Sequence, residues 1–324
     1  MTRYARQVIL PEIGEAGQDR LAAAHIVIVG AGGLAATALP LLAGAGIGHL
    51  TIIDGDRVEM DNLHRQTFFT EGDIGLSKAE VASVRCKSLN SDIVVDAVPA
   101  RLNPVNVDDY TTADLVLDCA DSYAVSYILS DHCHRTGIPL ISASALGVTG
   151  YVGGFCGTAP SLRALFPQAP ESGESCESLG VMGPVVSALG AMQAQLALNH
   201  LLAIEPPTLG RLIRYHGPAC RTSSFCFHDA AEPDTYFRFS SPALLRDSDL
   251  IIDLRGHDEA ADLIDPRARR IPVAECTNLP GRTAQDATDR LALCCATGLR
   301  AWRTAERLEN RWPGEIVLVA ASAS

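Results

Sequence analysis

Short apolar runs alternate with longer helix-like segments through the first half of the chain. Two of the helix-like segments span residues 77–90 and 122–136. The apolar runs are rich in β-branched residues, which is typical of buried strands. They are HIVIVG (25–30), HLTIID (49–54), DIVVDAV (92–98), DLVLDCA (114–120) and IPLISAS (138–144). Strands that alternate with helices predict an α/β fold with a doubly wound, Rossmann-like, mostly parallel sheet.

A long apolar segment, residues 184–204, follows these strands. It contains Gln193, Gln195, Asn199 and His200. Burying such polar groups in lipid is costly, so we expect a buried helix and not a membrane span.

A domain boundary is expected near residue 238, because residues 228–245 are rich in turn residues. We assign residues 1–235 to a first domain and residues 240–324 to a smaller α/β domain. The linker between them is long enough to let the small domain move. The small domain contains the strand-like DLIIDLRG (249–256), the helix-like RAWRTAERLENRW (300–312) and the strand-like EIVLVAA (315–321).

Composition narrows the class of protein. Of the 324 residues, 47% are hydrophobic and 20% are charged, and the formal net charge is -12. An acidic chain without a basic cluster argues against a nucleic-acid partner. The ten cysteines are scattered along the chain, as reduced thiols are, and the N-terminal apolar run is too short for a secretory signal. We therefore expect a cytoplasmic globular protein.

A glycine-rich turn follows the first strand. Gly30, Gly32 and Gly33 precede a helix, so backbone N–H groups and the helix dipole can hold a phosphate there. Asp54 ends the second strand, where an acid that binds a ribose belongs. These residues fit either NAD or ATP, and a tight turn without any ligand is the alternative.

The residues after Asp54 separate the two nucleotides. DGDRVEMDNLHRQTF (54–68) contributes Asn62, Arg65 and Gln66, and Lys78 follows in GLSKAE. Arg65 and Lys78 together can neutralise a triphosphate, whereas hydride transfer to NAD needs no such cations. The pattern favours ATP over an NAD-dependent oxidoreductase.

Six motifs in order resemble the ThiF/MoeB branch of the ubiquitin-activating superfamily. They are RYARQ (3–7), GAGGL (30–34), DGDRVEMDNLHRQ (54–66), GLSKAE (75–80), LDCADS (117–122) and CESLGVMGP (176–184). The resemblance implies ATP at the glycine turn, with Asp54 on the ribose and with Asn62, Arg65 and Lys78 on the phosphates. It assigns Asp121 to Mg²⁺.

The same resemblance implies partners and a reaction. Arg6 matches an arginine that reaches the neighbouring subunit's site, which implies a homodimer. The substrate is the C-terminal glycine of a small ubiquitin-like sulfur-carrier protein that ends in Gly-Gly. Adenylation of that carboxylate is followed by sulfur transfer from a sulfur donor, which gives a thiocarboxylate. A non-catalytic scaffold that only holds the carrier is the alternative. For the single residues, the alternatives are surface ion pairs for Arg6 and Arg65 and a solvated residue in the first helical turn for Lys78.

Cys176 lies in PQAPESGESCESLG (167–180), whose composition is typical of a flexible loop. It matches the family's loop cysteine, which links covalently to the activated carrier in several members. The alternative is an incidental thiol, because Glu174 and Glu177 raise the pKa of a neighbouring cysteine.

The chain departs from the family at its zinc positions. Ser161 and Ala164 stand where many relatives have C-x-x-C, and the second cysteine pair is missing. Four thiolates are needed for a closed structural zinc site, so we expect no zinc. The alternative ligand set is Cys156, Cys220, Cys226 and His228.

The C-terminal domain resembles a short rhodanese-like domain, in which ARRIPVAE (268–275) matches the second strand. LALCCATGLRAWRTAERL (291–308) contains C-x-x-G-x-R at Cys295, Gly298 and Arg300. A cysteine between a strand and a helix collects N–H groups that steady a persulfide. Cys294 should point to the opposite face of the sheet, because strand side chains alternate. The alternative is a degenerate domain kept for docking.

Overall fold

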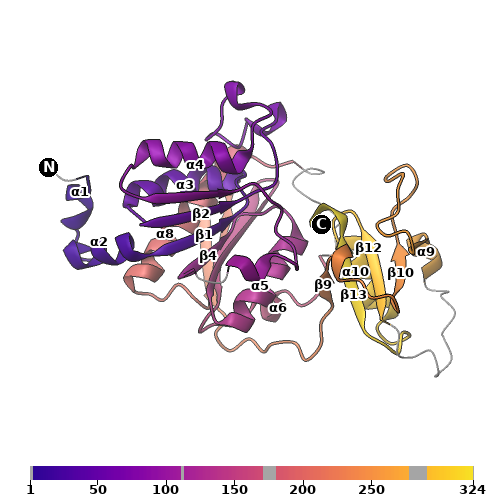
Figure 1. Ribbon diagram of the computed structural model, residues 1–324. Coiled ribbons are helices and arrows are strands. Elements are labelled where there is room, and N and C mark those ends of the chain that lie inside the picture. The colour runs from indigo at the N-terminus through magenta and orange to yellow at the C-terminus, as the bar shows by residue number, and fades with distance from the viewer. Residues whose placement is uncertain (1–2, 111–112, 171–179, 277–289, 324) are drawn as a thin grey trace.

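The computed structural model describes residues 3–110, 113–170, 180–276 and 290–323. It contains two β-sheets, one of eight strands and one of five. Figure 1 shows the larger sheet with its helices and the smaller sheet beside it, and the C-terminus at the junction between the two parts.

The larger sheet has the strand order β3-β2-β1-β4-β5-β6-β7-β8. The first five strands in that order are parallel, and β5, β6, β7 and β8 pair antiparallel. The bounds are β1 His25–Val29, β2 His49–Ile53, β3 Val94–Val98, β4 Leu115–Asp118, β5 Pro139–Leu146, β6 Thr149–Cys156, β7 Arg211–His216 and β8 Arg221–Cys226. The five predicted strands and the doubly wound fold class are confirmed.

Helices cover both faces of this sheet (Figure 1). Alternate residues of β1 enter different cores: Ile26 and Ile28 pack with α3, α4 and α8, whereas Val27 and Val29 pack with α5, as the two-residue period of a strand requires. The helices are α1 Ala5–Val8, α2 Gly14–Ala23, α3 Gly33–Ala45, α4 Lys78–Leu89, α5 Tyr123–Thr136, α6 Leu162–Leu165 and α8 Gly183–Leu202. Short 3₁₀ turns are η1 Met60–Asn62, η2 Glu71–Asp73, η3 Val107–Tyr110 and η4 Gly217–Ala219.

Helix α8 is, among the described residues, the one helix whose length and apolar composition would suffice to cross a membrane. Half of its apolar stretch is buried inside the protein, and it packs against α3, β5 and β6. Gln193, one of its polar residues, is fully buried and donates hydrogen bonds to Asp118 O and Ile141 O at 2.7 and 3.0 Å. This contact pattern is that of a core helix with a satisfied polar group.

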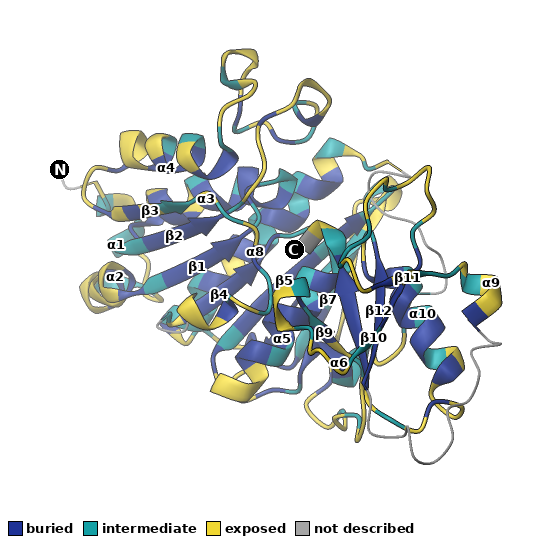
Figure 2. Cartoon of the chain, turned by 45° about the vertical axis from the view of Figure 1, so that its right-hand side comes forward, coloured by how far each residue is buried: buried dark blue, intermediate teal, exposed yellow. Residues whose placement is uncertain are grey.

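The smaller sheet is entirely parallel, with the order β11-β10-β12-β13-β9. Its strands are β9 Arg238–Ser240, β10 Leu250–Asp253, β11 Arg269–Arg270, β12 Leu291–Cys295 and β13 Ile316–Ala320; its helices are α9 Val273–Cys276 and α10 Leu299–Leu308, with 3₁₀ turns η5 Pro242–Leu244 and η6 Ala321–Ala323. In both sheets the central strands are buried and the outer helix faces are exposed, whereas β8 at the edge of the larger sheet is exposed (Figure 2).

Two expectations about this part are wrong. A second strand over residues 268–275 was expected, but only Arg269 and Arg270 pair, and Val273–Cys276 form a helical turn after Pro272, whose fixed φ suits a helix start. The region expected as a linker contains β9, which pairs with β13 and completes the sheet.

The two parts are docked against each other. Trp302 of α10 packs edge-on against Tyr127 of α5, with ring centroids 4.7 Å apart. Arg163 is 2% exposed, pairs with Asp131 and donates to Phe237 O at 3.1 Å. Both parts share one continuous apolar core, so the small sheet is packed against the large one.

Candidate active site

A cavity of about 750 Å³ opens at the carboxyl ends of the parallel strands. It lies where β1 and β4 are neighbours and the strand order reverses, which is where ligands bind in open α/β sheets. Its wall combines the glycine turn, the predicted phosphate cations and the C-terminal part. The polar and glycine members are Gly30, Gly32, Gly33, Asp54, Gly55, Asp56, Arg65, Gln66, Lys78, Arg101, Asp121, Ser122, Ser126, Ser144, Gln168, Thr297 and Ser322.

The glycine turn is shaped by close backbone approach. Gly30 has φ +92°, and a Cβ there would lie 2.7 Å from Cys119 O. A Cβ on Gly33 would lie 2.7 Å from Val186 Cγ1. Gly32 caps α3 and has open space on its cavity side, with Gln66 Nε2 at 3.7 Å from an added Cβ. The turn therefore presents the N-terminus of a thirteen-residue helix to the cavity, as a phosphate site requires.

Asp54 holds the turn in place. Its carboxylate accepts hydrogen bonds from Ala31 N and Asp56 N, each at 2.7 Å. Burial raises the pKa of Asp54, while these two N–H groups and the charge of Lys78 lower it in part. Each oxygen keeps a free lone pair, so the carboxylate can also accept from a ribose hydroxyl.

The two predicted cations line the cavity from different elements. Lys78 begins α4, and its side chain is 8% exposed. Its Nζ lies 3.5 Å from Asp56 Oδ2. Arg65 is half-buried in the segment after η1, and its Nη1 donates to Asp61 O at 3.3 Å. Neither cation is held by a short bidentate pair, so both can turn to an incoming phosphate.

Asp121, Gln66 and Ser122, which carry oxygen atoms suited to Mg²⁺, line the same cavity. Asp121 is exposed at the end of β4 and lines the cavity. The Oε1 of Gln66 and the Oγ of Ser122 are buried and have no hydrogen-bond partner among the described residues, although buried polar atoms normally have one. Three hard oxygen donors, two of them unsatisfied, fit the chemistry of Mg²⁺.

Asp118 is a buried acid that the sequence did not single out. It ends β4, is fully buried, and accepts hydrogen bonds from Ser142 Oγ at 2.7 Å and from Ala120 N at 3.2 Å. Burial raises the pKa of Asp118 to about 6, hydrogen bonds from Ser126 and Ser142 oppose this, and the charge of Asp121 adds to it.

This shift makes stability depend on pH. An unfolded chain loses the Asp118 proton near pH 3.8 and the folded chain near pH 6. Between these values the folded state binds more protons, so the free energy of unfolding falls as pH rises, by about 3 kcal/mol at about 1.4 kcal/mol per pKa unit. Asp118→Asn should remove this fall, as measured by urea unfolding at pH 4 to 7. Asp109→Asn, which removes an exposed carboxylate, is the control, and an unchanged pH profile for Asp118→Asn would contradict the assignment.

Two predicted site residues lie outside the cavity wall, and a third is not among the described residues. Asn62 is buried in η1 and donates to Asp61 Oδ1 at 2.7 Å, and it is not part of the cavity wall. Arg6 is exposed on α1, away from the cavity of its own chain. Cys176 lies outside the described residues.

The Cys295 sulfur sits at the start of α10. Its Sγ accepts hydrogen bonds from Gly298 N at 3.1 Å and Ala301 N at 3.4 Å, and Gly298 has φ +84°. The loop from Cys295 to Arg300 reaches the large cavity through Thr297 and Leu299. The sulfur itself is fully buried, so exchange with another molecule requires the loop to open.

Arg300 and Cys294 differ in their relation to this loop. Arg300 pairs with Glu259, and its Nη1 lies 3.4 Å from Leu254 O. Cys294 packs on the opposite face of the small sheet from Cys295, as the strand period predicted. Burial raises the pKa of Cys294 far above its ordinary value, which leaves it an unreactive thiol.

Ser161, at one of the expected zinc positions, forms hydrogen bonds with Glu232. Ser161 Oγ donates to Glu232 Oε2, and Ser161 N donates to Glu232 Oε1, both at 2.6 Å. Cys220 and Cys226 are exposed at opposite ends of β8, roughly 20 Å apart at about 3.3 Å per residue. They cannot share one zinc ion. Absence of zinc stays a prediction, which metal analysis of the purified protein tests.

Sequence reasoning missed two polar residues and an aromatic wall. Asp56 and Arg101 line the cavity and form an ion pair of 3.1 Å. Asp56 follows β2, and Arg101 follows β3. A charged residue just past the carboxyl end of a parallel strand was the signal that could have identified each of them. The aromatic wall comes from distant segments and carries no local pattern; it consists of Tyr123, Tyr127, Tyr151 and Phe166.

Fold and site together define a Rossmann-like domain whose cavity suits a nucleoside triphosphate. The loop that bears Cys295 reaches the same cavity. The ThiF family matches residues 4–235 of the chain. The chain therefore belongs to the ThiF family.

Relatives extend the match. The SAMP-activating enzyme E1 of Haloferax volcanii is 38% identical over 218 residues, which cover 66% of this chain and 81% of the relative. The adenylyltransferase and sulfurtransferase MOCS3 of Drosophila sechellia is 31% identical over an alignment 364 positions long, gaps included. The alignment covers 98% of this chain and 80% of the relative. Against other MOCS3 and UBA4 sequences the match spans about half of the relative, 50% and 52%. Among solved structures, E. coli MccB with ATP has the same fold, with a TM-score of 0.63 and 24% identity over 72% of this chain and 73% of that one.

Proposed function

We propose that this protein adenylates the C-terminal carboxylate of a small ubiquitin-like sulfur-carrier protein with ATP, and that sulfur transfer then converts the acyl-adenylate to a thiocarboxylate. One observation carries the proposal. A single cavity is lined by the glycine turn, by Arg65 and Lys78, and by the loop that bears Cys295. Several relatives are named adenylyltransferase and sulfurtransferase, and these names support both steps.

The chemistry of the first step follows from charge. The carboxylate attacks the α-phosphorus of ATP, a mixed anhydride forms, and pyrophosphate leaves. Both reactants are anions, so Arg65 and Lys78 must offset charge as they approach and as pyrophosphate departs. Asp121, with Gln66 Oε1 and Ser122 Oγ, would hold Mg²⁺, which supplies further neutralisation of the phosphates when bound. Asp54 would bind the ribose.

The second step uses the C-terminal domain. A sulfur donor places a second sulfur on Cys295, and the N–H groups of Gly298 and Ala301 stabilise the resulting anion. The terminal sulfur attacks the acyl carbon, the bond to AMP breaks, and an acyl disulfide with Cys295 forms. A second thiol, which we propose is Cys176, then attacks the Cys295 sulfur. The thiocarboxylate leaves, a disulfide forms between the two cysteines, and an external thiol reductant must reduce that disulfide before the next cycle.

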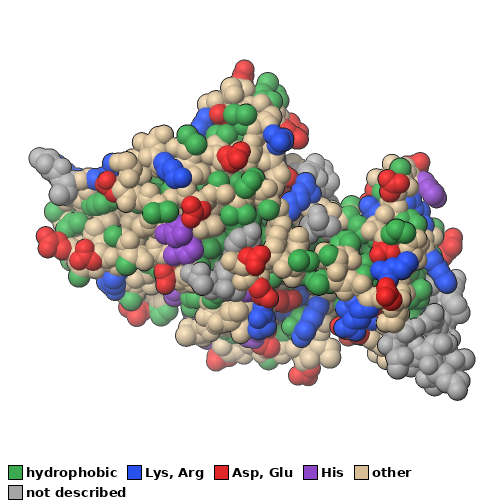
Figure 3. Space-filling model, in the orientation of Figure 1, with side chains coloured by type: hydrophobic (Ala, Val, Ile, Leu, Met, Phe, Trp, Pro, Cys, Tyr) green, Lys and Arg blue, Asp and Glu red, His purple; other side chains and the backbone are tan. Residues whose placement is uncertain are grey.

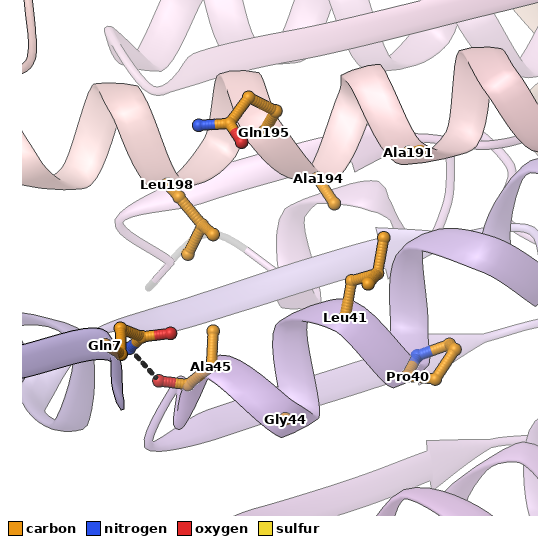
Figure 4. Close-up of a pocket in the computed structure, with 9 residues that line it drawn as sticks. All are labelled: Gln7, Pro40, Leu41, Gly44, Ala45, Ala191, Ala194, Gln195 and Leu198. Carbon is orange, nitrogen blue, oxygen red and sulfur yellow. Dashed lines mark hydrogen bonds between the residues drawn. The ribbon is translucent and has the colours of Figure 1, made fainter. Parts of the chain in front are cut away.

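A homodimer is part of the proposal. A groove of about 340 Å³ lies on the outer surface between α1, α3 and α8, and Figure 4 shows apolar and small side chains along it. Leu41 in this groove is 46% exposed, and Gln7 beside Arg6 donates to Ala45 O at 2.9 Å. A second copy seated here would cover the apolar face and bring Arg6 to its partner. A molar mass of one chain in solution would contradict this part.

The test uses a purified carrier that ends in Gly-Gly. With ATP and Mg²⁺ the protein should catalyse ATP–pyrophosphate exchange only when the carrier is present. With a sulfane donor the carrier should gain the mass that results from replacing one oxygen by sulfur. Carrier binding without exchange would favour the scaffold reading over catalysis.

Acidic and basic side chains are interspersed on the face in Figure 3, so carrier recognition there relies on shape and local pairs more than on one charged field.

A further inference from the structure

Arg101 lies where the large sheet, the cavity and the end of the C-terminal part meet. Its Nη1 donates to Ser322 O at 2.7 Å, and its Nη2 donates to Asp56 Oδ1 at 3.1 Å. The other oxygen of Asp56 lies 3.5 Å from Lys78 Nζ. One guanidinium therefore connects the end of the C-terminal part to the lysine that the proposed function places on the phosphates.

The site is shaped for this contact. Arg101, Asp56, Lys78 and Ser322 all line the same cavity. The stem of Arg101 crosses directly over Gly55, where a Cβ would lie 2.6 Å from Arg101 Cγ. A side chain at position 55 would displace the arginine, so the glycine leaves room for the bridge.

Charge makes the bridge sensitive to a nucleotide. Two cations share the one carboxylate of Asp56, which is 50% exposed, while the side chain of Lys78 is 8% exposed. A triphosphate carries more negative charge than Asp56 and competes with it for Lys78. Once Lys78 turns to the phosphates, Asp56 is left to Arg101 alone, and the pair that holds Ser322 becomes stronger.

We propose that Arg101 is a positioning residue that couples nucleotide binding to docking of the C-terminal domain. The inference rests on the proposed ATP site and goes beyond it. Coupling between two equilibria is reciprocal, so a docked C-terminal domain raises the affinity for ATP by the same factor by which ATP strengthens docking. The C-terminal domain thus has a role in the adenylation half of the reaction that does not depend on Cys295.

The two tryptophans of the chain, Trp302 and Trp312, both lie in the C-terminal part and report on this coupling. Trp302 packs against Tyr127, so its emission responds to a change in docking. The full-length protein is titrated with ATP and Mg²⁺ in the absence of carrier, and ATP binding is measured separately by equilibrium dialysis. Wild type should change its tryptophan emission as ATP binds.

Arg101→Met should lose the emission change and should bind ATP at least about fivefold more weakly, at the lower end of typical coupling factors. The substitution is at a half-exposed side chain, so folding is preserved. Gly55→Ala should give the same loss while it keeps the guanidinium. Arg135→Met is the control, because Arg135 pairs with Asp108 on the surface outside the cavity, and it should resemble wild type.

Three results would overturn the inference. Arg101→Met with wild-type affinity and wild-type emission change would show that no coupling passes through it. Weaker ATP binding by Arg101→Met without any emission change in wild type would show a direct phosphate contact instead. Failure of wild type to bind ATP would overturn the proposed function, and this inference with it.

Discussion

Replacing Arg65 or Asp121 by alanine is expected to slow ATP–pyrophosphate exchange by at least about a hundredfold, the scale of losing one preorganised charge partner of a transition state. Both side chains line the cavity, and each addresses charge that changes as pyrophosphate leaves. In the proposed reaction, Arg65 neutralises phosphate oxygens directly. Asp121 acts through the Mg²⁺ that its carboxylate would hold. Exchange of radiolabelled pyrophosphate into ATP, with a saturating carrier, measures the effect.

Matched controls separate this effect from a general loss of charge. Arg135→Ala removes a surface arginine that pairs with Asp108, and Asp92→Ala removes a surface carboxylate that pairs with Arg3. Neither lines the cavity, so exchange should stay close to wild type. Exchange at wild-type rates in both Arg65→Ala and Asp121→Ala would exclude the adenylation assignment.

Cys295→Ser is expected to abolish sulfane transfer from thiosulfate while pyrophosphate exchange continues. Gly298 N and Ala301 N donate hydrogen bonds to the Sγ of Cys295. A serine hydroxyl keeps these hydrogen bonds but cannot carry a persulfide. The glycine turn and the phosphate cations are unchanged, so adenylation proceeds. Formation of thiocyanate or thiocarboxylate measures sulfane transfer. Exchange of labelled pyrophosphate into ATP measures adenylation.

Cys294→Ser is the control for that substitution. Cys294 lies one residue earlier, on the opposite face of the sheet, and its raised pKa makes it a poor nucleophile. It should leave both activities in place. Thiocarboxylate formation that survives in Cys295→Ser with a physiological donor would mark the C-terminal domain as a docking element, with sulfur supplied by free sulfide or by another protein.

The local pattern of the chain determined most of the first domain. The apolar runs predicted β1 to β5, and the segments 77–90 and 122–136 are the helices Lys78–Leu89 and Tyr123–Thr136. Each of these elements has a signal within its own segment, a short apolar run for a strand or a helical period for a helix, so the local pattern is enough to find them. The same holds for the glycine turn and Asp54, since a tight turn and a strand end are short-range features.

Sequence also placed Arg65, Gln66, Lys78 and Asp121 in the cavity wall. Each follows the carboxyl end of a strand or begins a helix there, and parallel strands bring their carboxyl ends to one edge of the sheet. Asn62 follows the same logic and nevertheless turns toward Asp61. Its backbone belongs to a 3₁₀ turn whose direction depends on packing around it, which no spacing rule encodes.

Tertiary structure alone decided how the two parts meet. β9 is a three-residue strand whose partner, β13, lies far along the chain, and short edge strands carry no period of their own. No local pattern in the sequence marks Arg163, yet it is buried against Asp131 and the aromatic rings of Tyr127 and Trp302. The bridge from Ser322 through Arg101 to Asp56 joins segments that only folding brings together. Local chemistry and period therefore determined which residues can act on a nucleotide and on sulfur. Long-range packing decided that the loop that bears Cys295 reaches the same cavity through Thr297 and Leu299, because packing fixes contacts between residues with no relation in sequence.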